Sequence, residues 1–111
     1  MHNLLQIQEN IMPGEGAEYS ESMLSGSAGL RVERIISYGH VTPEGEWYNQ
    51  DEDEWVAVLE GSAAIAFPGG KEIALEAGDS LLLPKHVRHR VSRTSSPCIW
   101  LALFAPELNR N

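Results

Sequence analysis

The sequence predicts an all-β domain, either a small antiparallel barrel or a sandwich. Two observations support this prediction. From residue 30 onward, short segments rich in apolar and β-branched residues follow one another closely. Glycine and proline separate them, as in the PGG run at residues 68–70 and in EAGD around Gly78. Many short strands with turns between them are typical of β-barrels and sandwiches.

Seven strands can be placed along the chain. In the first, residues 30–38, Val32, Arg34 and Ile36 alternate with their neighbours, which is the period of two expected of a strand. The others are predicted at residues 54–61, 62–67, 71–78, 80–84, 89–94 and 98–104. Gly61 separates the second strand from the third, and Pro84 ends the fifth because proline has no donor for the ladder.

The segment before residue 31 has a different pattern. Tyr19, Met23 and Leu24 fall on one face if residues 17–24 are helical, and the SGSAG run that follows has the composition of a loop. We therefore predict a short helix there. At 111 residues the chain is expected to form one domain. Residues 1–30 would supply a strand or short helix that packs on a β-barrel formed by residues 31–111.

Charge and composition exclude several classes of function. The net charge of −8 argues against a nucleic-acid partner, because phosphate backbones attract clustered Lys and Arg. Cys98 is the single cysteine and lies in an apolar run, so we expect a buried thiol and a reducing compartment. We find neither a signal peptide nor an apolar run near the ~20 residues of a membrane span. The expected location is the cytoplasm, with no membrane partner.

Two motifs carry the chemical information. Residues 54–61, EWVAVLEG, place Glu54 and Gly61 seven positions apart. Residues 78–89, GDSLLLPKHVRH, contain Gly78, Pro84 and His89. Together the motifs resemble the two signature motifs of the cupin family, and the resemblance covers roughly residues 41–104. It implies a small antiparallel jelly-roll β-barrel with a site inside its mouth.

The resemblance also implies metal ligands, with Glu54 and His89 at two ligand positions. Cupins carry a His-x-His before the glutamate, and both of these histidines are absent here. Depending on the gap before Glu54, the matching positions hold Trp47 and Asn49 or Tyr48 and Gln50. Only one of these pairs can face inward, because neighbouring residues of a strand point to opposite faces. The sequence leaves the choice between the pairs open.

His86 stands where the second motif of the family has glycine. It would replace a lost imidazole if the chain turns after Pro84, since residues three apart in a straight strand point to opposite faces. His86, His89 and Glu54 would form the two-histidine, one-carboxylate set that suits iron(II). The predicted metal site is therefore His89, Glu54, His86 and Gln50, binding a divalent iron, manganese, nickel or zinc ion.

These features predict a small metal-binding cupin that acts on a small organic molecule, with dioxygenase- or isomerase-like chemistry. Tyr48 would be the proton donor or acceptor. The alternative is a non-enzymatic module that binds a small ligand, with or without metal, and an inert barrel is a third reading. We also expect a homodimer, because the edge strands of so small a barrel invite pairing.

Overall fold

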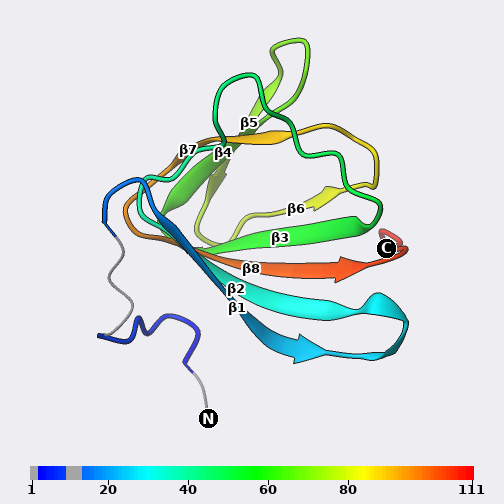
Figure 1. Cartoon of the computed structure of the whole chain (residues 1–111), viewed down its shortest axis with the longest axis horizontal. Coiled ribbons are helices and arrows are strands. Elements are labelled where there is room, and N and C mark those ends of the chain that lie inside the picture. Colours follow the sequence, from blue (N-terminus) through cyan, green and yellow to red (C-terminus); the bar gives the residue numbers. More distant parts are fainter. Residues whose placement is uncertain (1–2, 10–13) are drawn as a thin grey trace.

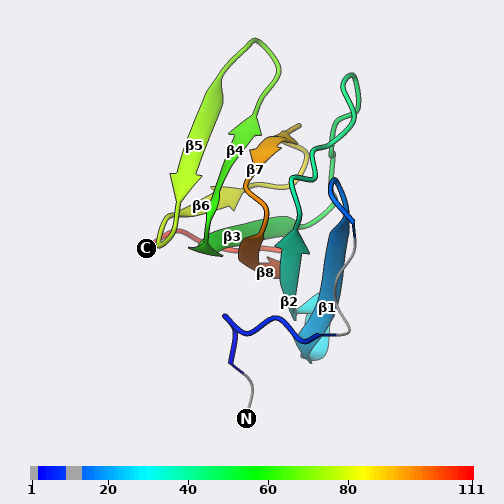
Figure 2. The ribbon, with the colours of Figure 1, turned by 90° about the vertical axis from the view of Figure 1, so that its left-hand side faces the viewer.

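The chain folds into two antiparallel β-sheets that face each other, in a computed structural model that describes residues 3–9 and 14–111 (Figure 1). The strands are β1 (Glu18–Ser25), β2 (Arg31–Ser37), β3 (Asp53–Glu60), β4 (Ser62–Ala66), β5 (Glu72–Glu76), β6 (Ser80–Leu83), β7 (Arg90–Thr94) and β8 (Cys98–Ala105). One sheet has the order β1-β2-β8-β3-β6 and the other the order β5-β4-β7. Figure 2 shows the smaller sheet lying across the larger one. The predicted all-β fold is confirmed.

All seven predicted strands are present as β2 to β8. The helix predicted over residues 17–24 is wrong, because those residues form β1, followed by a short 3-10 turn at Ser27–Gly29. β1 pairs antiparallel with β2, with Tyr19 opposite Ile36 and a shift of register between Ser22 and Leu24. Exposed and half-buried residues alternate along β1, as expected of an edge strand with one covered face. The helical spacing of Tyr19, Met23 and Leu24 was a coincidence that pairing with β2 overrode.

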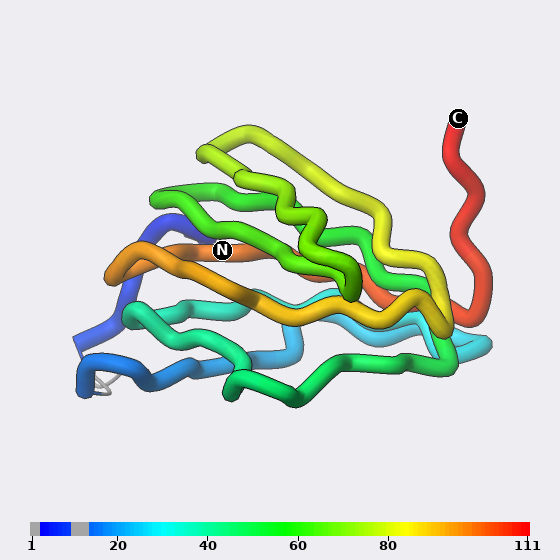
Figure 3. The backbone as a smooth tube through the Cα atoms, turned by 90° about the horizontal axis from the view of Figure 1, so that it is seen from above, coloured from blue at the N-terminus to red at the C-terminus, as the bar shows by residue number. Residues whose placement is uncertain are grey.

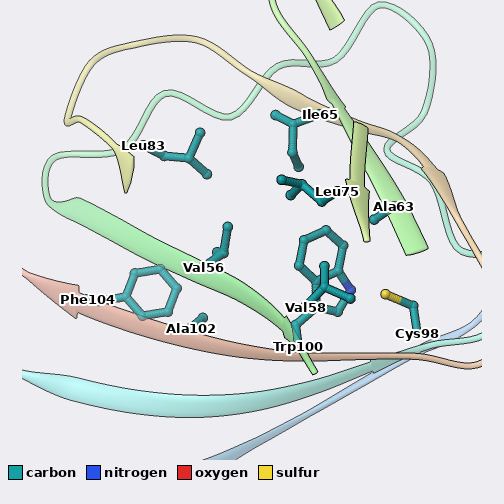
Figure 4. Packing of buried hydrophobic residues seen from close by; sticks show 10 residues of the cluster. All are labelled: Val56, Val58, Ala63, Ile65, Leu75, Leu83, Cys98, Trp100, Ala102 and Phe104. Carbon is teal, nitrogen blue, oxygen red and sulfur yellow. The ribbon is translucent and has the colours of Figure 1, made fainter. Parts of the chain in front are cut away.

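The main core fills the layer between the two sheets. Its ten buried residues come from β3, β4, β5, β6 and β8, and Figure 4 shows their side chains meeting in that layer. Trp100 is the largest of them, and its indole nitrogen donates a hydrogen bond of 3.2 Å to the Ser37 hydroxyl. The predicted buried thiol is also found here, because Cys98 is completely buried and burial raises its pKa to about 12. That thiol is therefore not a nucleophile at neutral pH.

The terminal segments are fastened to the larger sheet by two buried charged side chains. Arg34 on β2 donates hydrogen bonds to the carbonyl oxygens of Leu4 and Gln6. Asp53, at the start of β3, accepts hydrogen bonds from the backbone N–H of Lys85 at 2.7 Å and of Leu108 at 2.8 Å. The second of these bonds anchors the C-terminal segment, drawn in red in Figure 3. Within the described ranges, no helix is long and apolar enough to cross a membrane.

Candidate functional site

A pocket of about 210 Å³ lies between the two sheets at one end of the core. Its apolar wall is formed by Ile35, Val56, Ile65, Leu83, Val91, Trp100 and Phe104. Its polar wall is formed by Glu18, Ser20, Glu33, Tyr48, Gln50, Glu54 and His89. The pocket is smaller than the roughly 300–1,000 Å³ that drug-sized ligands occupy. It suits a compact molecule with one apolar and one polar side.

Glu54 is buried near the start of β3, with 8% of its surface exposed. It lies in the ladder between Leu83 of β6 and Phe104 of β8, so the strand fixes its direction into the pocket. Burial raises the pKa of Glu54 to about 7, and the charge of nearby Glu33 adds to the increase. A hydrogen bond from the Gln50 side chain lowers the pKa of Glu54 and so opposes this increase. The carboxyl group therefore changes its protonation state near neutral pH.

His89 faces Glu54 across the pocket, with 4.0 Å between His89 Nε2 and Glu54 Oε1. The imidazole is 4% exposed, and burial lowers its pKa, although a hydrogen bond to the Val87 carbonyl acts in the opposite direction. Its Nδ1 lies 3.1 Å from that carbonyl oxygen. A carbonyl oxygen can only accept, so Nδ1 carries the hydrogen and Nε2 of the neutral ring presents its lone pair to the pocket.

Tyr48 and Gln50 are the pair that lines the pocket, which settles the choice that the sequence left open. Tyr48 exchanges two backbone hydrogen bonds with His89, and the two rings stack with centroids 5.5 Å apart. The backbone N–H of His86 donates to the carbonyl oxygen of Gln50 at 2.8 Å. These bonds hold residues 48–50 beside residues 86–89. Burial, followed by the charge of Glu18, raises the pKa of the Tyr48 phenol.

His86 does not join the pocket. The chain does turn after Pro84, with the backbone N–H of Val87 bonded to the Pro84 carbonyl. His86 takes a left-handed conformation in that turn, with φ of 62°, and its side chain is 62% exposed. Its Nδ1 lies 3.3 Å from Oδ1 of Asn49 and 3.9 Å from Oδ1 of Asp51. The turn therefore directs the imidazole outward, although His89 points inward.

The pocket does not fit the predicted divalent metal. No group of three His, Cys, Asp or Glu side chains in the described part of the chain is arranged to hold a metal ion. Catalytic zinc sites, by comparison, take about three protein ligands. Of the four predicted ligands, Glu54, His89 and Gln50 line the pocket, and His86 does not.

Sequence reasoning missed three polar residues of the pocket wall: Glu18, Ser20 and Glu33. Glu33 lies on a strand that was predicted, but its face could not be assigned without knowing the partner sheet. Glu18 and Ser20 lie on β1, which was read as a helix. The alternation of Glu18, Ser20 and Ser22 with bulkier residues was the signal that could have found them.

Comparison with known families agrees with this geometry. The family model described as "Cupin domain" matches residues 35–104, which include β3 to β7 and most of the pocket wall. The chain belongs to the cupin family. A curated relative, the uncharacterized protein YdbB of Bacillus subtilis (strain 168), is 32% identical over 103 residues. That match covers 89% of this cupin and 84% of YdbB.

Solved structures show the same fold. A proposed mannose-6-phosphate isomerase from Ralstonia eutropha JMP134 is 36% identical, with a TM-score of 0.84, and the match covers 96% of this cupin and 98% of that chain. A cupin superfamily protein from Desulfitobacterium hafniense DCB-2 has a TM-score of 0.72 at 18% identity, over 87% of this cupin and 84% of that chain. The second similarity concerns the fold alone.

Proposed function

We propose that this cupin binds a small organic molecule in the pocket between its sheets and moves a proton on it. The observation that carries the proposal is the placement of Glu54 and His89, two buried groups that face each other at 4.0 Å across a cavity. The pKa of Glu54, about 7, supports it, because a general acid–base group works best when its pKa lies near the working pH. Proton transfer of this kind is isomerase-like chemistry.

Four polar residues of the pocket have distinct roles in this proposal. Glu54 takes the proton from a carbon next to a carbonyl group of the bound molecule and returns it to a neighbouring atom. Gln50 orients the Glu54 carboxylate through their hydrogen bond. His89 binds the ligand through Nε2, and the stacked Tyr48 ring holds the imidazole in place and presents its hydroxyl at the rim. The name of the 36% identical Ralstonia eutropha protein supports isomerase chemistry as the class to test.

The proposal is tested by hydrogen exchange, which needs no knowledge of the product. The protein is incubated in deuterium oxide with hydroxyacetone, dihydroxyacetone or aminoacetone, and loss of the α-proton signal is followed by NMR. We expect exchange above the buffer rate with at least one probe. In Glu54→Gln the rate should fall about 100-fold or more, because an amide cannot accept the proton.

The matched control is Glu60→Gln, the same substitution on the same strand at an exposed position outside the pocket. Its exchange rate should equal that of the unaltered protein. Exchange that persists in Glu54→Gln would contradict the role of Glu54. Binding of a probe in the pocket with no exchange by any of the three would overturn the proton-transfer proposal and favour the non-enzymatic binding module.

A further inference from the structure

The free hydrogen-bonding groups of the pocket wall are mostly acceptors. The His89 side chain is largely buried, but its Nε2 opens onto the pocket with a lone pair and has a Glu54 oxygen at 4.0 Å, beyond hydrogen-bond distance. Among the interactions of the described residues, Nε2 has no hydrogen-bond donor within the protein, so a ligand in the pocket that carries a donor can bond to it.

The carboxylates add negative charge to the same wall. Glu18, Glu33 and Glu54 come from three different strands and line one cavity. The Gln50 side chain donates to Glu54, and this hydrogen bond lowers the pKa of the carboxyl group. His40 Nε2 lies 3.7 Å from Glu18 Oε2, but His40 is not part of the pocket lining. Like charges held together in a partly desolvated cavity favour binding of a cation.

The nearest guanidinium does not neutralise this wall. Arg31 forms ion pairs with Glu33 at 3.1 Å and with Glu52 at 2.7 Å, so one positive charge serves two carboxylates. Its guanidinium carbon lies 4.0 Å from the centre of the Phe104 ring, and Arg31 is not part of the pocket lining. Among the described residues that line the pocket there is neither Lys nor Arg. A phosphate or carboxylate group would therefore meet negative charge with no cation to receive it.

We infer that the pocket takes a small organic amine in its protonated form, whose N–H groups donate to His89 Nε2 and the Glu54 carboxylate. The compact apolar part of the ligand packs on the apolar side chains of the same pocket, among them Val56, Ile65 and Trp100. The ligand needs a donor for Nε2, and the positive charge of an ammonium N–H also suits the carboxylates, which the neutral O–H of an alcohol does not. This inference rests on the proposed function and names the class of ligand on which that function acts.

The test compares four probes with the same carbon skeleton: isobutylamine, its N-trimethylated analogue, isobutanol and isobutyl phosphate. Binding to chelator-treated protein is followed by NMR, with the indole N–H of Trp100 as the reporter inside the pocket and that of Trp55, outside it, as the control. We expect the amine to bind at least about tenfold more tightly than the other three, because a charge-assisted hydrogen bond adds that much. The Trp100 signal should shift and the Trp55 signal should not.

Substitutions locate the interaction. Glu54→Gln keeps the shape of the side chain and removes its charge, so it should weaken amine binding about tenfold or more and leave isobutanol binding unchanged. Glu60→Gln is the matched control and should change neither. Preference for the alcohol, the trimethylated cation or the phosphate would overturn the inference. The deuterium-exchange test of the proposed function would stand independently of that result.

Two further outcomes would also overturn the inference. The first is that none of the probes shifts the Trp100 indole signal. The second is that Zn²⁺ or Mn²⁺ added alone binds at His89 and shifts this signal, while the amine does not shift it. The acceptor-rich wall would in that case be a metal centre. If the metal binds and proton exchange remains, only the ligand class was wrong; if exchange is absent as well, both proposals fail.

Discussion

At the scale of single residues, the informative feature is a carboxyl group buried without a cation of its own. Glu54 lies at the position where the cupin motif has a metal ligand, yet its closest polar neighbours are an amide and a neutral imidazole. Burial penalises the charged form of such a group, which raises its pKa. The same burial makes the Glu54 carboxyl group useful for proton transfer but makes the folded protein less stable when this group is ionised. The loss of stability can be measured.

Glu54 should make the protein less stable as the pH rises. The pKa is about 7 in the folded chain against an ordinary value of 4.5, so between these values the folded state keeps a proton that the unfolded state releases. Stability is therefore lost as the pH rises from about 4.5 to 7, and the loss is complete above the folded pKa. At 1.36 kcal/mol per pKa unit this loss is about 3 kcal/mol.

Glu54→Gln should remove this loss. We expect the variant to gain up to about 3 kcal/mol of unfolding free energy at pH 8 and little at pH 4.5, measured by urea denaturation at both values. Glu60→Gln on the same strand should show no such difference, because Glu60 is exposed. An equal gain at both pH values would mean that packing, and not ionisation, causes the effect.

At the scale of elements, the two motif glycines have different tasks. Gly61 connects β3 to β4 and Gly78 lies between β5 and β6, and both have positive φ, 86° and 95°. A side chain at Gly61 would collide with the Ser95 hydroxyl and come within 2.7 Å of the Pro97 carbonyl oxygen. At Gly78 nothing lies within 4 Å of an added Cβ. Gly61 is therefore required both because a side chain would not fit and because φ is positive. Gly78 is required only because φ is positive.

Gly78→Ala should therefore destabilise the fold by about 1–2 kcal/mol, the cost of a left-handed conformation for an L-residue. Gly61→Ala should cost about 1–3 kcal/mol more, because it also overpacks the contact with the loop before β8. Urea denaturation of the two variants measures the difference directly. Equal effects would show that the loop moves aside without penalty.

At the scale of the whole molecule, Arg34 joins the N-terminal segment to the sheet. Its guanidinium is 3% exposed, forms an ion pair of 2.6 Å with Glu21 of β1, and donates to the carbonyl oxygens of Leu4 and Gln6. This cluster lies on the face of the larger sheet away from the pocket, where Ile7 and Tyr19 pack on Ile36.

Arg34→Met should cost about 3 kcal/mol of unfolding free energy, since it removes one member of a buried charge pair. Hydrogen–deuterium exchange should show residues 3–9 losing protection before the strands do. The control is Arg93→Met, whose exposed guanidinium bonds to the Ser62 hydroxyl and should contribute less than about 1 kcal/mol. Unchanged protection of residues 3–9 in Arg34→Met would contradict the anchoring role. The homodimer and the cytoplasmic location stay predictions.

The sequence by itself determined the all-β class, seven of the eight described strands and the family, because strand period, turn residues and motif spacing are local properties. It also located Glu54 and His89, both of which line the pocket. These signals need no knowledge of which segments meet in space.

Only the tertiary structure decided which side chains share the pocket. The period of two divides residues 47–50 into two faces but does not say which face meets the second sheet, and pairing with His89 turned Tyr48 and Gln50 inward. The turn after Pro84 sent His86 outward, and pairing with β2 made β1 a strand whose Glu18 reaches the same cavity. The composition of the pocket was thus set by contacts between segments distant in sequence, which local patterns do not encode.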